Sequence, residues 1–201
     1  MIFSKGTPVW SDMSSLFVNL DRLALFLKKK QFTGSIRLKT DSRMFVILME
    51  EGDIVAGAEK DPGKDETVSL SVDQILLSVQ ESPDYRITVS RLESDLVDIF
   101  SKLYDRNVLD HGEDVRSELS DPDTFLKSRK DKKYTGCLCL DFPGKTGTAL
   151  ISLVNGSVEA VISDSIHLTR KDSAESRDRM ARMLLSKAKV KGAGVHSCTA
   201  G

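Results

Sequence analysis

Phe32-Thr33-Gly34-Ser35-Ile36-Arg37-Leu38 is a stretch that this chain uses twice, because about a hundred residues later it returns as Tyr134-Thr135-Gly136-Cys137-Leu138-Cys139-Leu140. Each copy is followed by an apolar run, a turn glycine and an apolar strand that contains an alanine. The matching positions are Gly52 and Ala56 after the first copy, and Gly156 and Ala160 after the second. Self-similarity at a fixed offset marks a duplicated structural unit. The sequence therefore predicts two related halves, each about a hundred residues long.

The hydrophobic pattern of the first half predicts helices and a meander of three strands. A helix that ends in Lys28-Lys29-Lys30 is predicted after Asp12, taken as its N-cap. The apolar stripe of this helix is formed at intervals of three and four by Leu16, Phe17, Leu20, Leu23, Ala24 and Leu27. The three strands are expected at residues 33–39, 44–50 and 54–58. The later elements are expected as a helix within 68–79, a strand at 85–89 and a helix over 92–103.

The second half repeats this order in a shorter form. A short helix that carries Phe125 and Leu126 is followed by expected strands at 135–142, 148–154 and 157–163, and by a last helix over 173–190. We find no evident counterpart of the strand that contains Tyr85, nor of the helix after it. The two halves are therefore expected to be unequal.

The predicted fold class is α+β, with two related halves that are each an antiparallel β-meander with helices packed on one face. The first unit, with its extra strand and helix, is expected at residues 11–107 and the second at 121–190. Between them, residues 108–120 belong to a stretch rich in Asp and Glu and are expected to be an acidic connector. Residues 191–201 are expected to be a flexible tail.

Composition restricts the function classes. With 40% hydrophobic residues, 29% charged residues and a net charge of -1, the chain reads as an ordinary soluble globular protein. No apolar stretch is long enough to cross a membrane and the start lacks the pattern of a signal peptide, so we expect a cytoplasmic protein. Three cysteines do not make a disulfide framework, which agrees with a reducing compartment.

The motif residues carry a resemblance to a known family. The order helix, aromatic-Thr-Gly, apolar strand and Gly-x-aliphatic-x-Ala is similar to the PatA N-terminal (PATAN) family and to related uncharacterised archaeal domains. The positions that carry it are Phe32, Thr33, Gly34, Gly52 and Ala56 in the first copy and Tyr134, Thr135, Gly136, Gly156 and Ala160 in the second. The resemblance implies a small α+β module of prokaryotic regulatory proteins that mediates protein interactions, with no established catalytic residues.

The same residues also have a direct structural explanation. Glycine supplies a positive φ or a close backbone approach at tight turns, and alanine lets a helix lie close to a strand. We therefore interpret the repeated motif as structural, and we look for function elsewhere on the chain.

One alternative is a metal site. Cys137 and Cys139 face the same way if they lie on a strand, and His196 and Cys198 repeat their spacing near the end of the chain. Three sulfurs and one imidazole nitrogen form a donor set that suits zinc. The competing interpretation is that these cysteines are small buried hydrophobic residues.

A second alternative is nucleic-acid binding. Residues 165–201 contain eight basic and three acidic residues, so the last helix is locally cationic. The candidate basic surface comprises Arg170, Lys171, Arg177, Arg179, Arg182, Lys187 and Lys189. Such a surface binds phosphates through counterion release. The competing interpretation is a solvated helix face, because the region lacks interleaved aromatic residues and a recognised reading motif.

No catalytic set can be singled out from this one sequence, so the sequence does not favour an enzyme. We expect a non-catalytic cytoplasmic module for protein interaction or regulation, without a cofactor and without a membrane partner. Its protein partner is not identified by any motif. Meander edges on both halves would also allow a homodimer.

Overall fold

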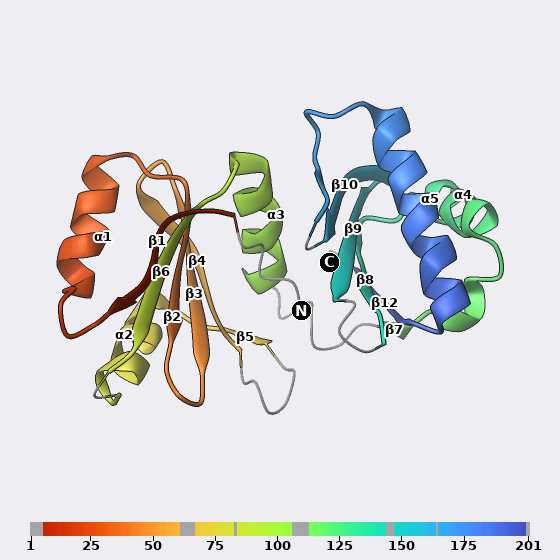
Figure 1. The fold of residues 1–201 in the computed structure, drawn as a ribbon. Coiled ribbons are helices and arrows are strands. Elements are labelled where there is room, and N and C mark those ends of the chain that lie inside the picture. The colour runs from red at the N-terminus through yellow and green to blue at the C-terminus, as the bar shows by residue number, and fades with distance from the viewer. Residues whose placement is uncertain are drawn as a thin grey trace. The chain divides into compact units, whose positions relative to one another are not determined.

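The computed structural model describes residues 6–60, 67–82, 84–105, 113–143, 147–163 and 165–199. The chain divides into two compact units, residues 5–110 and residues 111–201 (Figure 1). Each unit contains one six-stranded antiparallel sheet and its own helices. The predicted α+β class with two antiparallel halves is confirmed.

The first unit builds its sheet in the order β1-β6-β2-β3-β4-β5. Its strands are β1 (Thr7–Ser14), β2 (Gly34–Lys39), β3 (Met44–Glu50), β4 (Asp53–Lys60), β5 (Thr67–Ser69) and β6 (Arg86–Arg91). Its helices are α1 (Leu20–Lys29), α2 (Val72–Gln80) and α3 (Ser94–Asp105). The predicted meander is β2-β3-β4. The segment 68–79, expected to be helical, is split between β5 and α2, because Ser71 starts the helix with a capping box to Gln74.

The second unit builds its sheet in the order β11-β10-β9-β8-β12-β7. Its strands are β7 (Glu113–Asp114), β8 (Gly136–Asp141), β9 (Thr148–Val154), β10 (Ser157–Ser163), β11 (His167–Leu168) and β12 (Gly194–Thr199). Its helices are the 3-10 turn η1 (Arg116–Glu118), α4 (Pro122–Asp131) and α5 (Ala174–Lys191). Read from the other edge, its sheet has the same topology as the first, with β7 and β12 in the places of β1 and β6.

This topology corrects the prediction of a flexible tail. Residues 194–199 form β12, which lies between β8 and β7 and is the counterpart of β6 that the sequence seemed to lack. Val195, opposite Leu140, is only 1% exposed. The strand escaped detection because its six residues contain a single large aliphatic side chain, which gives no readable alternation.

The predicted acidic connector is also wrong where the structure describes it, since residues 113–119 belong to the second unit. Val115 and Leu119 are buried in its core. Glu118 accepts a hydrogen bond of 2.9 Å from Arg129, whose guanidinium is buried against the rings of Phe125 and Tyr134. Two apolar residues among many acidic ones were enough to anchor this segment. Residues 108–112 lie outside the described part of the chain.

At the N-terminus, the predicted helix starts later than Asp12. Asp12 lies in β1 with φ 54, and the N-cap of α1 is Asn19, whose side chain accepts the N–H of Arg22 at 2.9 Å. The apolar spacing was correct from Leu20 onward, where Leu20, Leu23 and Leu27 are buried. Leu16 and Phe17, which the pattern placed on the same stripe, are exposed.

Each sheet packs one face against two helices. In the first unit, Phe45, Ile47 and Met49 of β3 share a core with α1 and α2. In the second, Leu138 and Ile151 share a core with α4 and α5. The first unit has an additional layer, because α3 lies against the other face of its sheet (Figure 1). There, Val46 and Leu48 alternate with the residues of the first core and are buried as well.

The repeated motif performs the same task in both units, which is to fix a hairpin turn to the end of a helix. In the first unit, Gly52 donates a hydrogen bond to the carbonyl of Phe32 at 2.9 Å. The N–H of Glu51 donates to Thr33 Oγ1 at 3.0 Å. Glu51 and Gly52 both have positive φ, at 49 and 90 degrees. This combination is the one that a tight two-residue hairpin requires.

The second unit repeats these bonds at the matching positions. Gly156 donates to the carbonyl of Tyr134 at 2.7 Å, and Asn155 donates to Thr135 Oγ1 at 2.9 Å. A Cβ placed on Gly156 would lie 2.2 Å from Lys130 Cα, and one placed on Gly52 would lie 2.6 Å from the Lys28 carbonyl oxygen. We name this arrangement the turn–helix lock. It requires glycine for close approach as well as for backbone conformation.

A pair of glycine substitutions in the second unit tests this requirement. Gly156→Ala should lower the free energy of unfolding by about 3 kcal/mol or more, because backbone atoms of α4 cannot move aside. Gly192→Ala is the control: Gly192 also has positive φ, at 62 degrees, but a Cβ there meets nothing within 4 Å. It should cost only about 1 kcal/mol. Urea denaturation measures both, and equal losses would contradict the lock.

Candidate functional site

The structure brings the predicted metal ligands into register. On adjacent strands, Cys139 of β8 lies opposite His196 of β12, and Cys137 lies opposite Cys198. Residues 57 and 61 positions apart in sequence thus form two neighbouring cross-strand pairs. The sequence spacing predicted that Cys137 and Cys139 share a face, and that His196 and Cys198 repeat this spacing. Only the structure shows that the two segments pair as neighbouring strands.

The donors do not converge on a metal site in the described part of the chain. The His196 ring lies over Gly194, where an added Cβ would be 3.1 Å from Nε2, and Nε2 is 4.0 Å from Asp141 Oδ2. Among the described side chains, no three His, Cys, Asp or Glu residues are grouped so that they could hold a metal ion. The Cys198 side chain lies outside that set. The zinc hypothesis therefore gains no support from the geometry.

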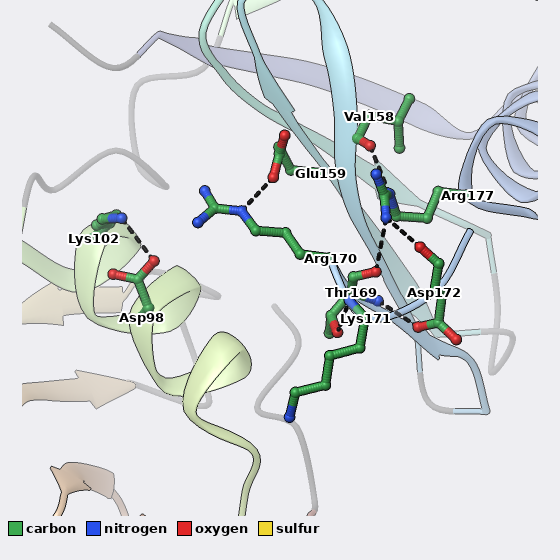
Figure 2. A network of polar contacts seen from close by, with 9 residues as sticks. All are labelled: Asp98, Lys102, Val158, Glu159, Thr169, Arg170, Lys171, Asp172 and Arg177. Carbon is green, nitrogen blue, oxygen red and sulfur yellow. Dashed lines mark hydrogen bonds and ion pairs between the residues drawn. The ribbon is translucent and has the colours of Figure 1, made fainter. Parts of the chain in front are cut away.

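The predicted basic surface is largely engaged within its own unit. Arg177 is the clearest case (Figure 2). Its Nε donates to the carbonyl of Val158 at 2.8 Å, and its Nη1 donates to the carbonyls of Thr169 and Asp172 at 3.1 and 2.5 Å. The guanidinium thus fastens the start of α5 to β10 and to the turn before the helix. It is a structural residue of the second unit.

Four other members of the basic set also have partners. Arg170 pairs with Glu159 (Figure 2), and Arg182 pairs with Asp123 at 2.7 Å. Lys187 lies over the ring of Phe142, 5.1 Å from its centroid, and Lys189 donates to the carbonyl of Ser120. For Lys171 the contact is made by the backbone, whose N–H donates to Thr169 Oγ1 at 3.4 Å.

The side chain of Arg179 is exposed, and it makes no hydrogen bond or ion pair with the described residues. The cationic helix that the sequence indicated is therefore mostly compensated by local partners. Four basic residues of α5 are engaged in this way, so the helix has little free charge with which to release counterions from a phosphate backbone. The nucleic-acid hypothesis is correspondingly weaker in the structure than in the sequence.

The motif residues lie where a structural role requires them. Phe32 and Tyr134 follow the ends of α1 and α4, and the two threonines hold the hairpin turns. Gly34 and Gly136 begin β2 and β8. Ala56 and Ala160 lie within β4 and β10, and Ala160 is fully buried. The structural interpretation of the motif accounts for these contacts.

Polar groups buried beneath α3 are the other chemically notable feature of the first unit. Burial raises the pKa of Tyr104 above its usual range, with Arg37 acting in the opposite direction. Burial also lowers the pKa of Arg37. Ser35 and Ser90 lie opposite each other in register, and neither hydroxyl has a hydrogen-bond partner among the described residues. The hydrogen bonds given for the described residues do not pair any of these groups with a base.

Residues 9–26 of the first unit contain several exposed apolar side chains. Large hydrophobic residues that are exposed in the described chain include six from residues 9–26: Val9, Trp10, Leu16, Phe17, Leu25 and Phe26. The rings of Trp10 and Phe26 contact each other, with centroids 5.9 Å apart. They remain 36% and 45% exposed. We name this exposed pair, Trp10 of β1 and Phe26 of α1, the β1–α1 surface.

Two elements produce this surface. The strand β1 lies at the edge of its sheet, pairing only with β6, and the register places Trp10 opposite Val89. Helix α1 buries Leu23 and Leu27 and turns Phe26 toward the edge strand. This surface was not predicted, because Leu16 and Phe17 were assigned to the buried stripe of a longer helix. The available signal was that the apolar residues of this segment exceed what one stripe can bury.

Basic side chains border the β1–α1 surface. Lys30 lies over the ring of Phe26, 5.9 Å from its centroid. Arg22 and Lys30 occupy the positions one turn before and one turn after Phe26 on the same side of the helix, and both are exposed, as is Lys29. Lys28 is instead paired with Asp53 at 3.1 Å. The aromatic pair is thus flanked by positive charge that has no carboxylate partner in the described residues.

The structural role of Arg177 can be tested against a neighbour on the same helix. Arg177→Ala should lower the free energy of unfolding by about 2 kcal/mol, because three carbonyl groups lose a charged donor. Arg179→Ala removes an equal charge from an exposed site and should change stability by less than about 0.5 kcal/mol. Denaturant unfolding compares the two variants. If both had the same small effect, the internal role of Arg177 would be refuted.

No helix in the described chain is both long and apolar enough to cross a membrane. A scan against protein-family models found no match, and no similar curated protein or solved structure was found. The PATAN resemblance is therefore still a prediction carried by the motif residues alone. The features that bear on function are the β1–α1 surface, the compensated basic helix and the cysteine pairs of β8 and β12.

Proposed function

We propose that this chain is a non-catalytic module that binds another protein through the β1–α1 surface of its first unit. The observation that carries the proposal is the contact between Trp10 and Phe26, which remain partly exposed at a sheet edge. Aromatic residues of this kind are enriched among the few side chains that supply most of the energy of a protein interface. The role agrees with the one that the PATAN resemblance implies.

The exposure of these apolar side chains to solvent supports a binding role. Exposed apolar side chains that occur singly need no explanation, whereas a group of them on one surface marks an interaction site. Tryptophan and phenylalanine offer large contact areas with few rotatable bonds, so little conformational entropy is lost when a partner covers them. The edge position of β1 also leaves one side of its backbone without a strand partner in its sheet.

The positive charge around the aromatic pair indicates the chemistry of the partner. Arg22, Lys29 and Lys30 surround the aromatic pair, so a segment with acidic residues around an apolar side chain would complement both features. We infer that the partner presents such an acidic and apolar segment. We place this interaction in the cytoplasm, in keeping with the cysteine content of the chain, and in a regulatory setting, which is the one that the PATAN resemblance implies.

The position of the only tryptophan makes the proposal directly measurable. Trp10 is the single tryptophan of the chain, so its fluorescence reports on the β1–α1 surface alone. Titration with a synthetic peptide of alternating glutamate and leucine should shift the emission to shorter wavelength, because the indole becomes buried. Raising the salt concentration should weaken this binding.

Two peptides and two variants serve as controls. A glutamate–serine peptide and a lysine–leucine peptide should produce no shift, because one lacks the apolar anchor and the other has the wrong charge. Phe26→Ser should weaken binding by about tenfold or more. Leu77→Ser, at an exposed apolar site on α2, should leave it unchanged. A shift that is equal for all three peptides, or insensitive to Phe26→Ser, refutes the proposal.

The nucleic-acid alternative has its own test. If the basic residues of α5 are engaged internally, the full chain should show no salt-dependent affinity for duplex DNA or for single-stranded RNA near physiological ionic strength. Fluorescence anisotropy with labelled oligonucleotides at two salt concentrations measures this. Tight binding that falls steeply with salt and is lost in Arg179→Ala would favour the alternative function.

A further inference from the structure

The pairing of β8 with β12 opposes two cysteines that the sequence places far apart. Cys137 lies opposite Cys198, flanked by the pairs Leu138–Ser197 and Gly136–Thr199 in an unbroken antiparallel register. Cys137 is buried. The β12 strand is the last element of the described chain and holds β7 at the edge of the sheet. A covalent bond at this position would therefore tie β12 to β8 in the interior of the sheet.

The backbone separation suits a disulfide. Residues directly opposite each other in an antiparallel pair have Cα atoms about 4.5 to 5.5 Å apart. Disulfides span Cα separations of about 4.4 to 6.8 Å. Cys137 and Cys198 therefore meet the distance requirement without any movement of the strands.

Cys139 provides an internal comparison, because the same register excludes it. Its directly opposite residue is His196, so Cys198 is its diagonal neighbour. Diagonal neighbours across a strand pair are about 7 to 8 Å apart, beyond the reach of an unstrained disulfide. The fold thus selects one of the two cysteines of β8, although they are only two residues apart in sequence.

We propose that Cys137 and Cys198 form a reversible cross-strand disulfide by exchange with a low-molecular-weight disulfide. One cysteine loses its proton, and the thiolate attacks a sulfur of the small disulfide, breaking its S–S bond and releasing one small thiol. The second cysteine thiolate then attacks the mixed disulfide and releases the other. Two protein thiols are oxidised, one small disulfide is reduced to two thiols, and the protons pass to the released thiolates.

This modification concerns the second unit only and is independent of the proposed binding surface. It would close a loop that contains β9, β10, α5 and most of β12, and long loops gain the most from closure. In the described residues β12 is held by its pairing with β8 and β7 and by Val195 in the core, and the disulfide would add a covalent link between β12 and β8. Reduction restores the original state.

The experiment uses the full chain incubated with oxidised glutathione and then quenched with acid. The intact mass should fall by the mass of two hydrogen atoms. Trypsin should then yield a linked pair of peptides, residues 134–145 and residues 192–201. Because the first peptide contains both Cys137 and Cys139, single variants assign the bond. Cys139→Ser should retain it, whereas Cys137→Ser and Cys198→Ser should abolish it.

A denatured sample is the matched control, because without the fold Cys137 and Cys139 should pair with Cys198 about equally. Native selectivity for Cys137, together with a thermal unfolding midpoint that rises by at least about 5 °C on oxidation, supports the proposal. A glutathione adduct that does not resolve, a bond to Cys139, or an unchanged midpoint overturns it.

Discussion

Both units depend on the close approach of a hairpin turn to the end of the preceding helix. The threonine hydroxyl accepts the N–H of the first turn residue, and the aromatic carbonyl accepts the N–H of the turn glycine. Because no side chain fits between the glycine and the helix backbone, the contact fixes both the register of the hairpin and the position of the helix over the sheet. The core on that face of each sheet then follows from the alternation of the strands.

This constraint explains why the two units share a topology while their surfaces differ. The lock uses about five residues and a helix end, so most exposed positions are left to vary. The first unit has an aromatic pair at its sheet edge and an additional helix on the second face of its sheet. The second has a long basic helix whose charges are largely compensated by its own carbonyls, carboxylates and one aromatic ring. A shared scaffold with divergent surfaces is what a docking function needs.

The elements predicted correctly were those with strong periodicity or a repeated motif. The strands β2, β3 and β4 and their partners in the second unit carry continuous apolar alternation around fixed turn glycines. The strands that escaped prediction, β1, β5, β7, β11 and β12, are short, polar or bulged, and each is specified by the neighbouring strand with which it pairs. Such strands are specified by their neighbours more than by their own residues. The same reason hid the β1–α1 surface, since the chain before Leu20 was assigned to a helix.

The sequence by itself determined the duplication, the α+β class and the two hairpin turns, because these depend on local pattern and on glycine conformation. It did not determine which charges are free, since the partners of Arg177 and Arg182 come from distant positions. Nor did it determine that Cys137 opposes Cys198 while Cys139 opposes His196. Those facts depend on strand register and helix placement, which result from packing the whole unit. Local pattern therefore specified the scaffold, and tertiary packing decided which side chains are available for function.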